Sequence, residues 1–321
     1  MRNILFFLAA CSILNLSAET YKIGFGSCLD QRNTQDIFFT IKNESLDHFI
    51  FLGDNVYGDA PWTGNLNKLI EAYRIQKTKL PAWLSEMQID AIWDDHDYGL
   101  NDGGKNFALK AEAQDLFLNF WDIPRSDPRH SQEGIYFSKT LNVNKKRVKI
   151  IALDTRYFRS DLKGQRNQYQ PNLDSDATIL GSEQWEWLKI EIAEPADLIL
   201  LLSSIQILAT QHRFEKWSNF PVEREKLLKL INESPNAANT ILVSGDRHRG
   251  ALYKSDATYE LTASALNKVA SQNLELDPLL VDKTFPELNY GIVEIDPKNS
   301  SVQIYLKDLK GDILVQGSIK I

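Results

Sequence analysis

Cysteine is scarce in this 321-residue sequence, which holds only Cys11 and Cys28. Cys11 lies in an apolar N-terminal stretch that we expect to be removed, and its loss would leave Cys28 alone. A single thiol cannot form a disulfide within its own chain, so a small disulfide-stapled fold is excluded. Cys28 is then either a buried, inert residue or one whose thiol is occupied, for example by a metal.

Long apolar runs and an excess of positive charge are lacking as well. Beyond the N-terminus, no stretch approaches the ~20 apolar residues of a transmembrane helix. Lysine and arginine number 36 against 43 aspartates and glutamates, which gives a formal net charge of −7. This balance argues against a nucleic-acid-binding function. A site for an anionic substrate would need local positive charge from metals or arginines.

The N-terminus itself has the pattern of an export signal. Met1-Arg2-Asn3 precedes an apolar run over residues 4–14, and Ala18 offers a small residue for cleavage. We therefore expect a signal peptide over residues 1–18 and a secreted or periplasmic mature chain. Residues 8–11 also spell a lipoprotein cleavage box, but only ten residues precede Cys11, so a lipid anchor ranks second.

Linkers, repeats and low-complexity segments are absent from the remaining chain, and apolar patterns alternate between strand and helix periods. We expect a single domain over residues 19–321, with a polar loop over 163–176. The alternation predicts an α/β (α+β) fold, in which helices cover a mixed-sheet core of two packed sheets. Strands are expected over 21–28, where the strand runs into a tight glycine turn, and over 46–52, 89–93, 135–137, 148–153, 196–204, 241–244, 259–262, 291–295, 302–306 and 313–321. Helices are expected over 36–43, 65–86 with a break at Pro81, 108–121, 181–194 and 222–232.

Residues 93–102, Trp-Asp-Asp-His-Asp-Tyr-Gly-Leu-Asn-Asp, form an unusual polar cluster. Four carboxylates, one imidazole and one amide follow directly after an apolar strand. Such a cluster is either an acidic surface loop or a metal site, since carboxylates buried together need a balancing cation. Only one or two residues of the run can reach one site. We therefore expect Asp94, Asp97 and Asp102 to support the loop rather than to bind a metal.

Other polar residues of the same kinds also follow apolar strands. In α/β folds, ligands gather at the carboxyl ends of the strands, so these residues are expected to meet. Oxygen donors suit calcium, manganese or magnesium, whereas a thiolate and a phenolate suit iron or zinc. Two such metals can clamp a phosphoryl group. The strand-end residues are Cys28, Asp54 with Tyr57, Asp95 with His96, Asp154 with Arg156, Gln206, and Asp246 with His248.

These motifs resemble the alkaline phosphatase D (PhoD-like) family of the calcineurin-like metallophosphoesterase superfamily. The resemblance spans residues 26–248, in family order, and the Trp-Asp-Asp-His-Asp-Tyr-Gly run is its most specific part. It implies a four-layer α/β/β/α sandwich with two mixed sheets. The superfamily's opening Asp-x-His is replaced by Gly26-Ser27-Cys28, as in the PhoD-like branch. The matching segments are residues 26–28, 53–57, 93–102, 153–159 and 244–248.

The resemblance also implies a metal cluster, Fe³⁺ with Ca²⁺, although other divalent metals are possible. Asp54 would bridge the metals, and Cys28 and Tyr57 would bind the more oxidised ion. Asp95 occupies the position of the superfamily's asparagine ligand. Asp246 and His248 replace the ligands of its Gly-His-x-His motif. The implied metal ligands are Cys28, Asp54, Tyr57, Asp95, Asp246 and His248.

Two further residues are implied in catalysis. His96 would protonate or steady the leaving group, and Arg156 would bind a phosphate oxygen through its forked guanidinium. The alternative for Arg156 is a structural ion pair. The expected activity is attack of a metal-bound hydroxide on a phosphate monoester or diester. Two alternatives stay open: a phosphodiesterase or phospholipase with little monoesterase activity, and a non-catalytic surface protein that binds phosphate or metal.

Overall fold

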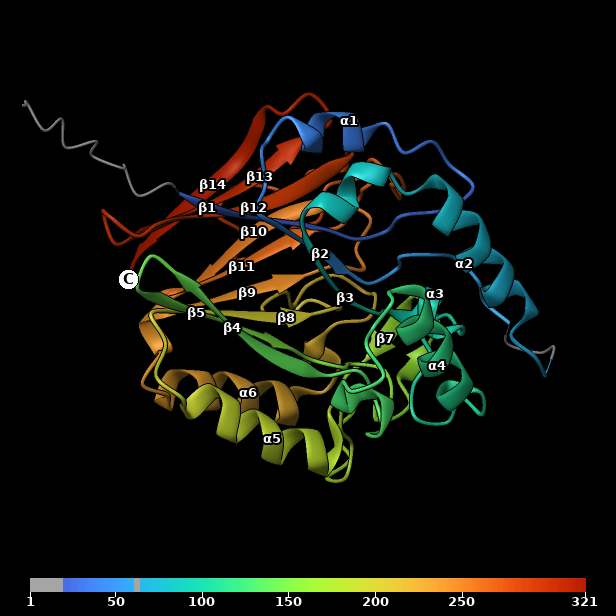
Figure 1. Cartoon of the computed structure of the whole chain (residues 1–321). Coiled ribbons are helices and arrows are strands. Elements are labelled where there is room, and N and C mark those ends of the chain that lie inside the picture. Colours follow the sequence, from blue (N-terminus) through green and yellow to red (C-terminus); the bar gives the residue numbers. More distant parts are fainter. Residues whose placement is uncertain (1–19, 61–63) are drawn as a thin grey trace, which may run out of the picture.

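The computed structural model describes residues 20–60 and 64–321 (Figure 1). The expected signal peptide and Cys11 lie outside the described residues. Within these ranges, none of the helices combines the length and apolar composition needed to cross a bilayer.

Two six-stranded mixed sheets form the centre of the molecule. In spatial order, the first contains β14 (Ile313–Lys320), β13 (Ser301–Asp308), β12 (Asn289–Asp296), β1 (Tyr21–Gly26), β2 (His48–Leu52) and β3 (Gln88–Ile92). The second contains β10 (Gly250–Ser255), β11 (Thr258–Ala263), β9 (Thr240–Ser244), β8 (Leu198–Ser203), β5 (Lys146–Ala152) and β4 (Phe137–Val143). The expected pair of mixed sheets is confirmed.

Helices cover the outer faces of both sheets. Figure 1 shows α5 (Gly181–Ala193) and α6 (Pro221–Glu233) along the second sheet. On the first sheet, Phe38 of α1 (Ile37–Lys42) packs against Phe49 and Phe51 of β2. α2 (Asn67–Lys79) lies beside α4 (Lys110–Phe120), where Tyr73 contacts Phe120. The four-layer α/β/β/α sandwich is therefore present. Short 3-10 helices are η1 (Ala82–Glu86), η2 (Pro128–His130), η3 (Trp217–Asn219) and η4 (Ala237–Asn239).

Strand β8 illustrates why the apolar runs of the sequence become central strands. Its residues Leu198, Leu200 and Leu202 belong to the core between the sheets. Ile199 and Leu201 point the other way, into the core under α5 and α6. Because successive side chains of a strand alternate between faces, a strand buried on both faces must be apolar throughout.

The structure differs from the expected elements at a few places. The segment 163–176, expected to be a loop, contains a small hairpin of β6 (Lys163–Gln165) and β7 (Gln168–Gln170). The strand expected over 135–137 instead begins at Phe137 and runs to Val143, because it pairs along the whole of β5. The expected long helix over 65–86 ends at Lys79, and η1 follows the break at Pro81.

Candidate metal centre

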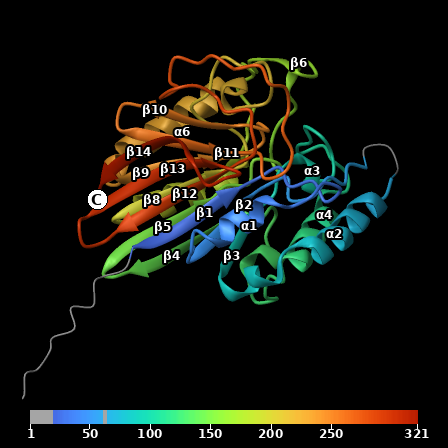
Figure 2. The same cartoon turned by 90° about the horizontal axis from the view of Figure 1, so that it is seen from above.

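The predicted ligands lie at one edge of the two sheets. β1, β2 and β3 are parallel neighbours in the first sheet, and β5, β8 and β9 are parallel neighbours in the second. Parallel strands end at a common edge, so the loops that follow them meet there. Figure 2 shows α3 (Asp95–Tyr98), which carries Asp95 and His96, beyond the ends of β1 and β2.

Four of the predicted ligands sit in sharply turned backbone. Cys28, Asp54, Asp246 and His248 have φ angles of 58°, 54°, 68° and 52°. Non-glycine residues rarely adopt this left-handed conformation, which costs on the order of 1–3 kcal/mol and is held only by its surroundings. Such strain clusters at functional sites because it aims side chains that an unstrained turn would point elsewhere.

The first part of the site is formed by Cys28, Asp54, Tyr57 and His248. The Cys28 Sγ lies 3.6 Å from the Asp54 Oδ2, and the Tyr57 hydroxyl donates to the same oxygen at 2.9 Å. His248 Nδ1 lies 3.0 Å from the carbonyl oxygen of Lys268, so Nδ1 carries the proton and Nε2 is available as a ligand. One ligand atom each from Cys28, Asp54 and His248 falls within a 4.8 Å cluster.

The second part of the site is formed by carboxylates. Ligand atoms of Asp94, Asp95 and Asp246 lie within 4.8 Å of one another, as do those of Asp54, Asp95 and His96. The Oδ2 of Asp94 and the Oδ1 of Asp95 are buried and have no hydrogen-bond partner. Because buried carboxylate oxygens without a partner are costly, these atoms fit a bound cation. Asp54 and Asp95 each belong to two groups, as expected for adjacent metals that share ligands.

The electrostatics of the site agree with this fit. Burial, followed by the neighbouring carboxylates, raises the pKa of Asp54 and Asp246 well above the ordinary value. Burial and the nearby Asp54 likewise raise the pKa of the Cys28 thiol and the Tyr57 phenol. A bound cation reverses these effects, because its charge favours the ionised form of every ligand. The site residues are therefore suited to bind metal as anions.

His96 lies at the mouth of this cluster. Its Nδ1 is 2.6 Å from Oδ2 of Asp59, and its ring contacts that of Tyr57 in a tilted arrangement, with the centroids 4.2 Å apart. Burial lowers the pKa of His96, but the charges of Asp95 and Asp54 outweigh it and hold that pKa well above the ordinary value. Asp59 was not singled out in the sequence, although it follows Asp54 in the same loop.

Arg156 is placed differently from the expected phosphate contact. Its side chain is fully buried, with Nε 2.6 Å from the Asp94 Oδ1 and Nη1 2.5 Å from the Glu215 Oε2. Glu215 also pairs with Arg159 at 2.9 Å. This arrangement favours the ion-pair alternative, since the guanidinium is engaged by two carboxylates beneath the site. Glu215 gave no sequence signal because it lies in a loop 59 residues away from Arg156.

The other acidic residues of the 93–102 run have mainly supporting contacts. Asp97 accepts from the backbone N–H groups of Asp94, Asp54 and Asn55 at 2.5, 3.3 and 3.2 Å. The backbone N–H of Asp102 donates to the Asp95 Oδ2 at 2.7 Å. Asp97 thus joins the loops after β2 and β3, as expected. Asp94 does more than support the loop, because its Oδ2 has no hydrogen-bond partner and the residue belongs to one ligand group with Asp95 and Asp246.

A cavity of about 270 Å³ opens above these residues. Asp95, His96, Asp246, His248 and Arg213 are among the residues that line it. The sequence did not single out Arg213, which lies in a loop between β8 and η3. The cavity is large enough for a phosphoryl group and part of its ester.

Comparisons with known proteins identify the fold and the family of the chain. The solved structure of PhoD is similar at a TM-score of 0.71 and 18% identity, covering 93% of this chain and 69% of that one. GAP50, described as the anchor in the inner membrane complex of Plasmodium, has a TM-score of 0.65 at 12% identity and coverages of 94% and 89%. A purple acid phosphatase from yellow lupin seeds has a TM-score of 0.62 at 11% identity. This chain is covered to 94%, but it spans only 54% of the lupin enzyme.

At these identities, the structural matches establish the metallophosphoesterase fold. A search of curated proteins finds no match. The family model described as PhoD-like phosphatase matches residues 23–275, which is most of the chain and contains every predicted ligand. The protein therefore belongs to the PhoD-like phosphatase family and is a metal-dependent phosphoric ester hydrolase.

Proposed function

We propose that the chain is an exported hydrolase in which Cys28, Asp54, Tyr57, Asp95, Asp246 and His248 hold two metals, Fe³⁺ with Ca²⁺. The observation that carries the proposal is the overlap of three ligand groups through Asp54 and Asp95 at the base of one cavity. Thiolate and phenolate donors support a ferric ion on one side. Carboxylates with Asp94 nearby support a hard divalent ion on the other. Export rests on the signal pattern of residues 1–18.

When bound, the metals would polarise the phosphoryl oxygens and make a water molecule acidic. The protein's own groups then have separate tasks. His96 holds a proton on Nε2, since Nδ1 is bound to Asp59, and gives it to the departing alkoxide. Arg156 keeps Asp94 oriented from below instead of contacting the phosphate.

The test is hydrolysis of para-nitrophenyl phosphate and bis(para-nitrophenyl) phosphate by the mature protein across pH. Activity should disappear on chelation and return with iron and calcium. The ratio of the two rates assigns a monoesterase or a diesterase, including the phospholipase alternative. His96→Ala should abolish turnover and leave the metal content, measured by mass spectrometry, largely unchanged. Metal binding without turnover of either ester would instead favour the non-catalytic alternative.

A further inference from the structure

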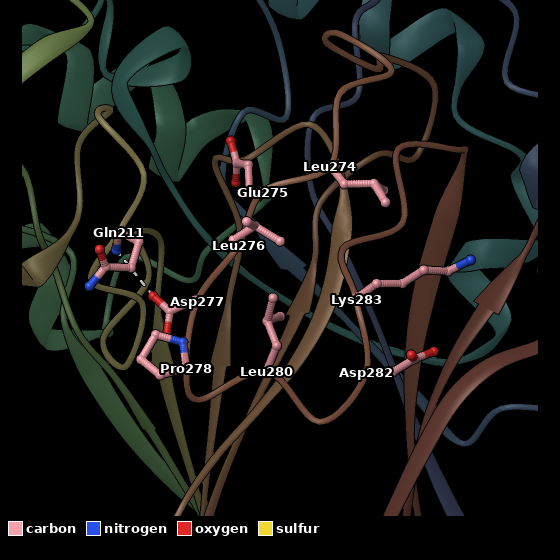
Figure 3. A pocket seen from close by; sticks show the side chains of 9 residues that line it. All are labelled: Gln211, Leu274, Glu275, Leu276, Asp277, Pro278, Leu280, Asp282 and Lys283. Atoms are coloured by element: carbon pink, nitrogen blue, oxygen red, sulfur yellow. Dashed lines mark hydrogen bonds between the residues drawn. The ribbon is translucent and has the colours of Figure 1, made fainter.

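A groove leads outward from the cavity above the metal centre. That cavity adjoins a second one of about 610 Å³. The two share Arg213, Phe214, Arg249 and Ser271. The second cavity adjoins a third of about 400 Å³, shown in Figure 3, and shares with it Gln211, Glu275 and Leu276. The groove therefore has an inner, a middle and an outer section, and a substrate's leaving group can extend along it.

The middle section carries spare positive charge. Arg213 and Arg249 line it, and Arg247 lies beside them. The single carboxylate there, Glu275, is already shared between Arg247 at 2.5 Å and Arg249 at 3.7 Å. Within residues 20–60 and 64–321, Arg213 has no carboxylate at ion-pair distance, and its guanidinium lies 5.3 Å from the centroid of the Phe214 ring. Arg213 is therefore available to an anion from solvent.

The loop that carries Arg213 is fixed from two sides. The backbone N–H of Tyr169, in the β6–β7 hairpin, donates to the Arg213 carbonyl at 2.9 Å, and the Tyr169 hydroxyl donates to the Asp102 Oδ2 at 2.7 Å. From below, the buried Lys216 ammonium donates to the carbonyl oxygens of His212 and Phe214. A cation on a fixed loop loses less conformational entropy when it binds an anion.

The outer section has the opposite character. Figure 3 shows Leu276 and Leu280 along it, together with acidic side chains. Apart from Glu275, which is paired with Arg247 and Arg249, its charged residues are Asp277, Asp282 and Lys283, so two carboxylates accompany one ammonium. An anionic group is disfavoured there, and the anion-binding part of the groove is limited to the middle section.

We propose that Arg213 binds a second anionic group on the leaving alcohol of the substrate. The inference rests on the proposed function and narrows its substrate class to phosphate esters whose alcohol bears another phosphate a few bonds away. In the reaction, water adds its oxygen to the phosphorus bound at the metal centre, and the P–O bond to the alcohol breaks. The alcohol leaves with a proton and with its second phosphate still on Arg213.

The experiment compares kcat/KM for butane-1,4-diol bisphosphate and for 4-hydroxybutyl phosphate, using phosphate release by the metal-loaded protein. The parent should prefer the bisphosphate, and Arg213→Gln should lower this preference about tenfold. Arg213→Lys should keep most of it. The matched control is Arg147→Gln, because Arg147 is an exposed arginine at the start of β5, at the opposite end of the strand from the site. It should leave both rates unchanged.

A binding measurement separates this inference from the proposed function. Calorimetry with butane-1,4-bisphosphonate and butylphosphonate, which cannot be hydrolysed, should show tighter binding of the bisphosphonate that is lost in Arg213→Gln. If neither ester is turned over but this difference is seen, the proposed function fails and the anion site stands. The inference would be overturned if the parent protein had equal kcat/KM for the two esters and bound the two phosphonates with equal affinity. An equal loss on both esters in Arg213→Gln would also overturn it, since Arg213 would then serve the reacting phosphate.

Discussion

At the residue scale, Asp59 fixes the orientation of His96 through a 2.6 Å contact with Nδ1. We expect Asp59→Asn to lower kcat about 10–100-fold, because a carboxylate partner sets both the tautomer and the basicity of a histidine. Metal content should stay at the parental level. Steady-state kinetics and metal analysis check this, with Asp122→Asn, an exposed surface aspartate, as the control. Loss of metal in Asp59→Asn would contradict a role limited to His96.

Glu215 balances two buried guanidiniums beneath the metal centre. Glu215→Gln should destabilise the fold by about 3–5 kcal/mol, because Arg156 and Arg159 would keep their charge without this partner. Urea unfolding measures the change. Glu186→Gln, which breaks an exposed pair with Lys189, should cost less than about 1 kcal/mol. A similar loss of unfolding free energy in the two variants would show that the buried Glu215 does not stabilise the fold more than an exposed ion pair does.

His212 is half-buried, and its hydrogen bonds suit the neutral imidazole. Its Nδ1 accepts the Phe214 N–H at 3.3 Å, and its Nε2 donates to the Gln206 Oε1 at 2.9 Å. Burial, followed by the charge of Arg247, lowers its pKa well below the ordinary value. Below about pH 6.5 the unfolded chain binds a proton here and the folded chain does not, so stability falls as pH decreases.

The contribution of His212 approaches about 1.4 kcal/mol per pH unit below that point. His212→Gln should remove it, so the stability difference between parent and variant should shrink between pH 7.5 and 5.5. Urea unfolding at several pH values checks this. A difference that stays constant with pH would mean that folding does not change the pKa of His212, and would contradict the prediction.

Sequence reasoning identified residues whose signal is local. Cys28, Asp54, Asp95 and Asp246 each follow an apolar run, and their loops meet because the strands are parallel. Asp59, Glu215 and Arg213 were missed because their roles depend on partners that are distant in sequence or on the shape of a groove. The ion pairs of Arg156 were missed for the same reason, since its position after β5 says nothing about the carboxylates that enclose it.

At the scale of elements, the turn after β2 depends on close backbone approach. Gly53 has a φ of +99°, and a Cβ there would lie 2.5 Å from the Asp94 Cβ and 2.7 Å from the Asp94 N. Gly53→Ala should therefore cost the left-handed penalty of about 1–2 kcal/mol plus about 1–3 kcal/mol of overpacking. Gly64→Ala is the matched control, with a φ of +65° and no atom within 4 Å of the added Cβ. Thermal unfolding should show a larger fall in Tm for Gly53→Ala than for Gly64→Ala. Equal falls in Tm would contradict the packing argument.

The periodicity of single elements predicted the strands and long helices well. β8 and β9 are apolar throughout, and α5 and α6 present a buried stripe. The β6–β7 hairpin escaped prediction because its residues are polar and mostly exposed. Its position is instead set by Tyr169, through contacts with Arg213 and Asp102 that no local pattern records.

At the scale of the whole molecule, the candidate metal centre takes its ligands from both sheets. Cys28, Asp54 and Asp95 follow strands of the first sheet, whereas Asp246 and His248 follow β9 of the second. Metal that binds only the folded chain should stabilise it, by about 2.7 kcal/mol at a hundredfold excess over Kd. Chelation should therefore lower the Tm, and Asp54→Asn should abolish this dependence. A Tm that is insensitive to chelation in the parent would contradict a shared centre.

The same arrangement decides where the protein acquires its cofactor. Its candidate ligands are scattered from Cys28 to His248, so an unfolded chain presents them far apart and offers no preformed chelating motif. The identity of the bound ions is then governed by the ion pool of the compartment in which folding occurs. Under the proposed export, a chain that crosses the membrane unfolded would take its ions from outside the cell, whereas a chain that folds first would carry cytoplasmic ions across.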